Sequence, residues 1–176
     1  MRPEGTRAVR PGEPTPQLEL PLVGGGVFRL AELQPETFAM IVFNRGLHCP
    51  VCQAQLRELD RRIDELGERG IEVVSVSGES EERATRMRDA WKIRHLRLAY
   101  GLDEQQMREW GLFVSRGLND SEPPVFNEPA LFLLRPDLTV YYESLLSMPV
   151  GRPRLDDLLG AIEWWAAHDY PARGEA

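Results

Sequence analysis

Apolar runs of strand length alternate with segments of helical periodicity through the middle of the chain. Residues 38–44 form a continuous apolar run and residues 71–76 are short and rich in β-branched side chains, so both are predicted to be buried strands. Between them, apolar residues recur at intervals of three and four over 50–69, as on one face of a helix, and Gly70 ends the pattern. This order predicts a parallel, right-handed strand-helix-strand unit.

The segments on either side extend this unit into an α/β domain. Two short strands around three consecutive glycines predict an N-terminal β-hairpin. After the central unit we expect a helix over 79–91, a strand at 96–100, a short helix over 104–110, a loop over 115–128, two antiparallel strands at 130–134 and 139–142, and a last helix from Pro153. Residues 1–16, rich in Pro and Gly, are predicted to be a flexible arm, and residues 17–176 one domain.

Composition narrows the choice of partners and location. With 176 residues and 42% hydrophobic content, the chain can bury a core without structural disulfides or metals. The net charge of -7 repels phosphate backbones and anionic membranes, so neither nucleic acid nor a membrane is an expected partner. No apolar stretch approaches the roughly 20 residues of a membrane helix, and the first residues lack the apolar core of a secretory signal. We therefore expect a soluble, cytoplasmic protein.

The two cysteines are the strongest candidates for chemistry. Cys49 and Cys52 lie in the segment His-Cys-Pro-Val-Cys, directly after the first buried strand and at the start of the predicted helix. Unpaired N–H groups and the helix dipole favour a thiolate there, which lowers a cysteine pKa from about 8.5 to roughly 3.5–7.5. Pro50 suits the first helical position, where its missing N–H costs nothing. We expect the more exposed Cys49 to start disulfide exchange and the buried Cys52 to resolve it.

Other readings of this segment are weaker. A zinc site needs two more ligands, and only His48, His95 and His168 offer nitrogen, none in a second paired motif, so neither a metal nor another cofactor is expected. His48 is a candidate for tuning the neighbouring thiol by charge or for supplying a proton, or it faces solvent. Arg45 is a candidate cation near the sulfur, or it forms a surface salt bridge.

The stretch Asn-Arg-Gly-Leu-His-Cys-Pro-Val-Cys, residues 44–52, resembles the Arg-Gly-x-x-Cys-Pro-x-Cys segment of peroxiredoxin-like proteins of the alkyl hydroperoxide reductase/thiol-specific antioxidant (AhpC/TSA) group. Residues 147–153 and 169–174 are also similar to that group. The resemblance implies a thioredoxin-like fold, with a central mixed β-sheet flanked by helices. It also implies a cis-proline that faces the cysteines before an antiparallel strand, for which Pro129 is the candidate; the alternative is a trans proline that starts a strand.

The chain departs from the peroxide motif of typical peroxiredoxins, which reads Pro-x-x-x-Thr-x-x-Cys. If Cys52 takes the peroxidatic position, Cys49 and Arg45 stand in the threonine and proline positions. If Cys49 takes it, Gly46 and Val42 stand there. Neither register restores the motif, so we expect disulfide exchange to be favoured over peroxide reduction.

The leading hypothesis is therefore a thiol-disulfide oxidoreductase or peroxiredoxin-like antioxidant that cycles with thioredoxin or another dithiol reductant. One alternative is a true peroxidase acting on hydrogen or alkyl peroxides. A second is a non-enzymatic binding module that uses the 115–128 loop and exposed aromatic side chains. Among these, Trp164 lies off the apolar stripe of the last helix. It is a candidate contact in a homodimer or with another partner, or it packs against the tail.

Overall fold

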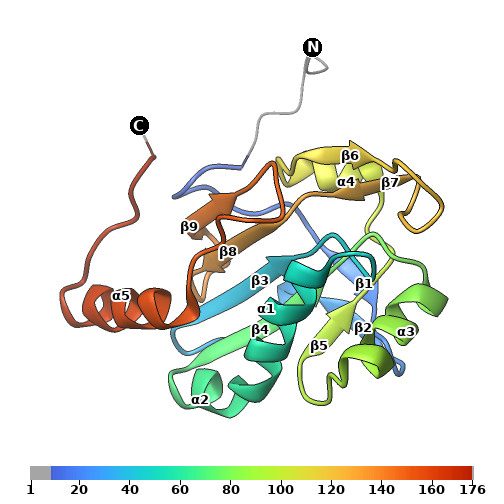
Figure 1. Ribbon diagram of the computed structural model, residues 1–176. Coiled ribbons are helices and arrows are strands. Elements are labelled where there is room, and N and C mark those ends of the chain that lie inside the picture. Colours follow the sequence, from blue (N-terminus) through green and yellow to red (C-terminus); the bar gives the residue numbers. More distant parts are fainter. Residues whose placement is uncertain (1–8, 176) are drawn as a thin grey trace.

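The centre of the molecule is a five-stranded mixed sheet with strand order β5-β4-β3-β8-β9 (Figure 1). The computed structural model describes residues 9–175. Strands β3, β4 and β5 are parallel, and β8 is antiparallel to β3 and β9. The α/β class, the parallel unit and the mixed sheet are confirmed. The strands of this sheet are β3 (Phe38–Phe43), β4 (Ile71–Val76), β5 (Arg97–Ala99), β8 (Ala130–Leu134) and β9 (Val140–Leu145).

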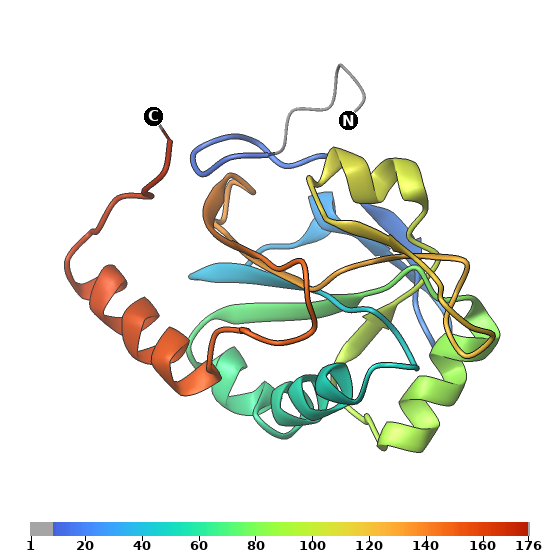
Figure 2. The ribbon, with the colours of Figure 1, turned by 45° about the horizontal axis from the view of Figure 1, so that its top comes forward.

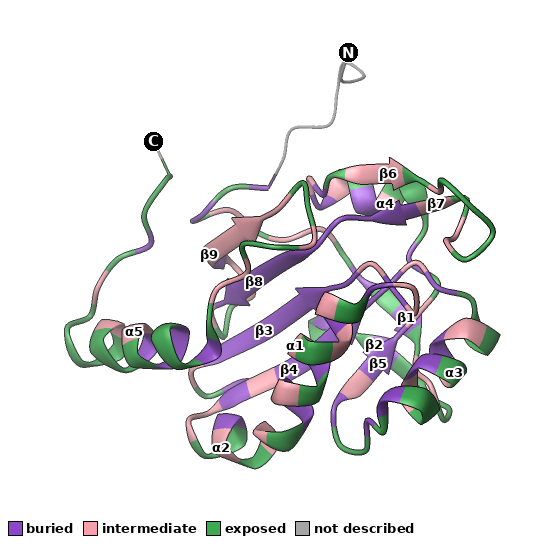
Figure 3. Ribbon diagram, in the orientation of Figure 1, coloured by how far each residue is buried: buried purple, intermediate pink, exposed green. Residues whose placement is uncertain are grey.

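Helices cover one face of the sheet, and a helix with the N-terminal hairpin covers the other (Figure 2). Alternate residues of β3 belong to two separate cores, and all six are buried, as Figure 3 shows. A strand buried on both faces needs apolar residues at every position, which explains its unbroken apolar run. The first face carries α1 (Pro50–Arg61), α2 (Ile63–Glu68), α3 (Glu81–Trp91) and α5 (Leu155–Ala167); the second carries α4 (Glu104–Glu109), β1 (Glu19–Pro21) and β2 (Val27–Arg29).

The N-terminal hairpin is confirmed, and the helix expected over 50–69 is divided. β1 and β2 pair antiparallel around Gly24, Gly25 and Gly26, all at positive φ. Arg62 separates α1 from α2, with its backbone at φ -109°. No Gly or Pro stands at this break. The Arg62 side chain bonds Glu65 and reaches Asp156 at the start of α5, a tertiary contact that periodicity along the chain does not reveal.

The loop expected over 115–128 contains a small hairpin. β6 (Val114–Arg116) and β7 (Val125–Asn127) pair antiparallel, so the loop prediction is wrong for 115–116 and 125–127 and holds for the residues between the strands and for Glu128. Strands of three residues are too short to show an alternating pattern. This hairpin leads directly into Glu128 and β8, at the same edge of the sheet as the cysteines.

Residues 9–16 are attached to the domain where an arm was expected. Val9 is buried, Gly12 donates its N–H to the Val140 carbonyl at 2.7 Å, and Pro14 forms a bridge with Thr139. These backbone contacts depend on β9, which is distant in sequence. The rest of the expected arm lies outside the described residues. None of the helices within residues 9–175 has both the length and the apolar character needed to cross a membrane.

Substitution of Phe132 tests the packing of the core on the α4 face of the sheet. Its ring is fully buried and meets Phe43 and Trp110 edge-on, at centroid distances of 5.8 and 5.1 Å. We expect Phe132→Ala to lower the free energy of unfolding by about 3–5 kcal/mol, because it leaves a cavity among rigid rings. Phe113→Ala is the control, since that side chain is 41% exposed. Equal losses in chemical denaturation for the two variants would contradict this packing.

Candidate active site

The chain leaves β3 and turns into α1 at Cys49, which is the N-cap of that helix. The Cys52 N–H donates to the Cys49 sulfur at 3.2 Å, so the sulfur takes the place of the usual oxygen acceptor at a helix start. Pro50 occupies the first helical position, as the sequence indicates. The local sequence thus places one sulfur where a negative charge is stabilised by the helix N-terminus.

Both sulfurs are inside the protein. Cys49 and Cys52 each have 0% exposed surface, so the expectation that Cys49 is the more exposed one is wrong for this reduced form. They belong to the core on the α1 face of the sheet, against which Leu47 and Val51 also pack. A substrate therefore reaches Cys49 only after neighbouring groups move.

The two thiols differ in how readily they lose a proton. The hydrogen bond from the Cys52 side chain lowers the pKa of Cys49 to about 6, with further help from the Cys52 amide and the Arg152 charge, against the opposing effect of burial. Burial raises the pKa of Cys52, and its role as donor to Cys49 raises it further. Cys49 is consequently the thiolate near neutral pH, and Cys52 keeps its proton.

Arg152 is the functional residue that the sequence analysis missed. Its Nη2 donates to the Cys52 sulfur at 3.0 Å and lies 3.9 Å from the Cys49 sulfur. Its Nε bonds the Pro149 carbonyl at 2.8 Å and its Nη1 bonds Gln55, which fixes the guanidinium plane. Arg152 stands about a hundred residues after the cysteines in a chain with 21 Lys and Arg. The segment that contains Arg152 is similar to the AhpC/TSA group, but this resemblance did not indicate that Arg152 contacts a cysteine sulfur.

Arg45 approaches the cysteines mainly through its backbone. Its N–H lies 3.4 Å from the Cys52 sulfur, whereas its Nε pairs with Glu128 at 3.1 Å, in a setting where the two side chains are only 17% and 6% exposed. The guanidinium also lies 5.0 Å from the Phe126 ring centre. Glu128 accepts a further hydrogen bond from the Ser115 hydroxyl at 2.7 Å. The Arg45 charge is thus largely balanced by a buried carboxylate, and a side-chain hydrogen bond from Arg45 makes the smallest contribution to the low pKa of Cys49.

His48 packs against an aromatic ring. It meets Phe126 edge-on at 4.8 Å, and both of its ring nitrogens are buried without a hydrogen-bond partner among the described residues. Burial lowers the pKa of His48, and the Arg45 charge lowers it further. The neutral ring is therefore the dominant form at neutral pH, which leaves no standing positive charge for tuning the thiol.

The expected cis-proline is absent. No cis peptide bond occurs in the described part of the chain, so the Glu128–Pro129 bond is trans and the cis prediction is wrong. X–Pro bonds favour trans by about 0.5–1 kcal/mol, and side chains before the proline already link this corner to the cysteine loop. Asn127 donates to the Asn44 carbonyl at 3.1 Å, and Glu128 pairs with Arg45. Pro129 itself accepts from the Leu146 N–H at 3.0 Å, toward β9.

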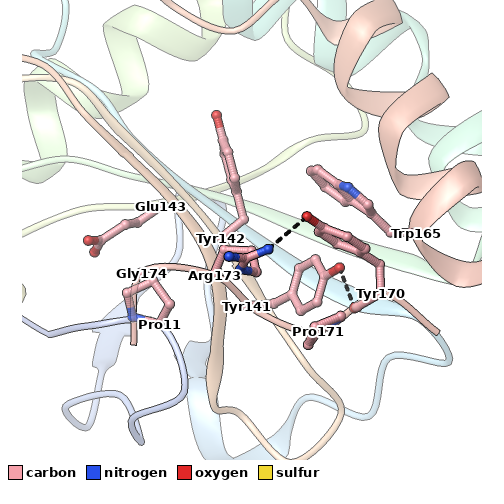
Figure 4. Close-up of a pocket in the computed structure, with 9 residues that line it drawn as sticks. All are labelled: Pro11, Tyr141, Tyr142, Glu143, Trp165, Tyr170, Pro171, Arg173 and Gly174. Atoms are coloured by element: carbon pink, nitrogen blue, oxygen red, sulfur yellow. Dashed lines mark hydrogen bonds between the residues drawn. The ribbon is translucent and has the colours of Figure 1, made fainter. Parts of the chain in front are cut away.

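Other places in the molecule offer less chemistry. Within residues 9–175, no group of three or more His, Cys, Asp or Glu side chains converges as a metal site. A cavity of about 300 Å³ lies between β9, α5 and the C-terminal tail, where Figure 4 shows the rings of Tyr141, Tyr142 and Trp165. Neither cysteine lines it. The reactive groups of the protein are therefore concentrated at the start of α1.

Comparison with known proteins identifies the family of this chain. The AhpC/TSA family model matches residues 11–143. The chain therefore belongs to the AhpC/TSA family, whose members are thiol-dependent oxidoreductases. This assignment sets aside the non-enzymatic binding module. Comparison with curated protein sequences gives no match.

Solved peroxiredoxins share the fold at low sequence identity. The reduced 2-Cys peroxiredoxin of Plasmodium vivax superposes with a TM-score of 0.74 at 18% identity, covering 93% of this chain and 84% of that chain. AhpC of Mycobacterium bovis gives 0.74 at 15% identity, covering 97% and 99%. A peroxiredoxin-like protein from Aquifex aeolicus gives 0.71 at 16% identity, covering 90% and 88%. The likeness confirms the thioredoxin-like architecture of this family.

The difference in pKa between the two thiols predicts how thiolate absorbance changes with pH. Thiolate absorbance of the reduced protein should rise with pH through an inflection near pH 6, from Cys49. In Cys52→Ala the main stabilising donor is lost, so the inflection should move up toward the value of a free cysteine, about 8.5. Cys49→Ser, which retains only Cys52, should show no inflection below that value. A wild-type inflection near pH 8.5 would contradict the assigned roles.

Proposed function

We propose that this protein is a thiol-disulfide oxidoreductase that cycles Cys49 and Cys52 between a dithiol and a disulfide. The observation that carries the proposal is the hydrogen-bonded pair at the start of α1, where one sulfur is a thiolate acceptor and the other holds a proton one helical turn away. Disulfide exchange needs a nucleophilic thiolate and a neighbouring thiol that resolves the mixed disulfide. The Cys-Pro-Val-Cys segment supplies both.

The first step is attack of the Cys49 thiolate on a substrate disulfide. A bond forms between Cys49 and one substrate sulfur, the substrate S–S bond breaks, and the other sulfur leaves as a thiolate that takes a proton from water. Cys52 then gives its proton to solvent and attacks the Cys49 sulfur, the mixed disulfide bond breaks, and the second substrate sulfur leaves as a thiolate that takes a proton from solvent. The substrate gains two electrons and the protein becomes a disulfide, so a dithiol reductant must restore Cys49 and Cys52.

Arg152 supports the second step. Once Cys49 is in a mixed disulfide, its negative charge is gone and it no longer holds the Cys52 proton. The Arg152 guanidinium, 3.0 Å from the Cys52 sulfur, then becomes the main group that stabilises a thiolate on Cys52. The buried position that disfavours charge on Cys52 in the resting protein is offset at the moment when Cys52 must react.

The substrate and reductant follow from this chemistry. The substrate is a protein or small-molecule disulfide, and the reductant is thioredoxin or another dithiol. Because Cys49 is covered, binding of either partner must open the surroundings of the sulfur.

The cytoplasmic location remains a prediction, and so does a homodimer. Trp164, the candidate for such a contact, stacks on His168 at 4.2 Å and is half exposed.

Peroxide reduction is the second candidate, favoured by family membership and by Arg152. In that reaction the Cys49 thiolate attacks the O–O bond and becomes a sulfenic acid, while the leaving oxygen takes a proton and departs as water or an alcohol. Cys52 then condenses with the sulfenic acid, releasing water and leaving the same disulfide. The threonine and proline of the usual peroxide motif are missing whether Cys49 or Cys52 is taken as the peroxidatic cysteine. The Arg45 guanidinium is paired with Glu128, so fewer groups are available to bind the peroxide.

Mild oxidation is the first test of the cycle. One equivalent of oxidant should convert both thiols into one intramolecular disulfide that dithiothreitol reverses, because the two residues are three apart at a helix start. Thiol counting by mass spectrometry follows this conversion. Two unreacted thiols after oxidation, or a disulfide only between two copies of the chain, would sink the proposed cycle.

Comparison of substrates distinguishes the two candidates. With one reductant, we expect turnover of a disulfide substrate to exceed turnover of hydrogen peroxide. Cys49→Ser should abolish exchange, and Cys52→Ser should accumulate a mixed disulfide with the substrate, since nothing resolves it. Peroxide turnover at or above about 10⁴ M⁻¹s⁻¹, the low end for efficient enzymes, with negligible disulfide turnover, would favour the peroxidase instead.

A further inference from the structure

Glu79 is a fully buried carboxylate that the proposed reaction does not use. It lies between β4 and α3 and is 1% exposed. Burial of a charge is costly unless it is paired, and Arg83 pairs with it twice. Arg83 Nε lies 2.6 Å from one carboxylate oxygen and Nη2 lies 3.2 Å from the other. Since β3 and β4 are parallel, this ion pair sits at the same sheet edge as the cysteine loop.

The Glu79 carboxylate also holds the turn that precedes Cys49. It accepts the Leu47 N–H at 2.7 Å, and the Cys49 N–H closes the turn on the Gly46 carbonyl at 3.1 Å. Gly46 has φ +105°, and a Cβ at that position would collide with the Glu79 carboxylate. Only glycine lets the backbone lie this close to Glu79. The turn and the carboxylate are therefore fitted to each other.

Both ends of this segment contact the sulfurs. Cys49 ends the turn and accepts the Cys52 N–H, and Arg45, just before it, places its own N–H near the Cys52 sulfur. A shift of the turn would alter both contacts together. The position of the turn thus determines the geometry on which the difference in pKa between the two thiols depends.

We propose that Glu79 is a positioning residue that fixes the turn over residues 46–49 through the Leu47 N–H and so keeps the Cys49 sulfur on the Cys52 amide. This role rests on the proposed function of the two cysteines. Arg83 extends the same network, because its Nη2 also donates to the Ser121 carbonyl at 3.0 Å. The loop between β6 and β7 is thereby tied to the cysteine turn through one ion pair.

Glu79→Gln tests the role with nearly unchanged volume. In Glu79 one oxygen accepts from both Leu47 and Arg83 Nη2, and the other accepts from Arg83 Nε. Glutamine has a single acceptor oxygen, so an amide donor would face either the Arg83 Nε donor or the Leu47 and Nη2 donors, and the side chain must shift away from the turn. We expect the inflection of the Cys49 thiolate titration to rise by about one pH unit, a tenfold change in the protonation equilibrium. The charged and titratable groups that face Cys49 are Cys52, Arg45 and Arg152, and none of them changes in this variant.

The matched control is Glu65→Gln. Glu65 also pairs with an arginine, Arg62, but it lies on α2 and has no bond to the turn, so its replacement should leave the inflection of Cys49 unchanged. A purely structural role for Glu79 would lower the melting temperature of Glu79→Gln without moving the inflection measured on folded protein, and that result would overturn the proposal.

Wild-type protein gives a second measurement that does not depend on whether the variant folds. Amide hydrogen exchange at Leu47 should be slow for a loop residue, since its N–H is bonded to a buried carboxylate. Exchange at the rate of an unprotected loop amide would also overturn the proposal. Both readouts use no substrate, so failure of the wild-type protein to reduce disulfides would contradict the proposed function, whereas an unmoved inflection or an unprotected Leu47 amide would contradict the role of Glu79.

Discussion

The site depends on one interaction, the hydrogen bonding of Cys49 by Cys52 at the first turn of α1. The amide of Cys52 donates to the Cys49 sulfur, and the Cys52 thiol supports the same negative charge. Two otherwise similar thiols thereby become different, because one is the acceptor and the other the donor. The helix start provides the geometry, and the strand before it delivers the chain to that point. Without this asymmetry, the pair would be two buried, unreactive thiols.

Charged groups around the pair come from distant parts of the chain. Arg152 approaches both sulfurs from the segment before α5, while Glu128 draws the Arg45 side chain toward the β7–β8 corner. Glu79 accepts the Leu47 N–H of the turn before Cys49. Each charge is paired or hydrogen-bonded, as burial requires. Arg152 is thus the cation whose charge acts on both sulfurs, whereas the Arg45 charge is paired with Glu128.

Much of this architecture is predictable from local patterns, and the rest depends on contacts between distant residues. The run over β3, the glycine hairpin and the placement of Cys49 at a helix start follow from residue types within one segment. The β6–β7 hairpin is too short to leave a pattern, and the break at Arg62 coincides with a contact to Asp156 at the start of α5. Burial of Cys49 and the approach of Arg152 likewise arise only when the chain folds. The trans bond at Pro129 shows that a feature carried over by resemblance needs its own evidence.

In the reduced protein Cys49 carries the negative charge while Cys52 retains its proton. Limited alkylation of the reduced protein at neutral pH, followed by peptide mapping, tests this claim directly, because only a thiolate reacts at an appreciable rate. We expect the first label almost entirely on Cys49. Label found first on Cys52, or divided equally between the two cysteines, would contradict it.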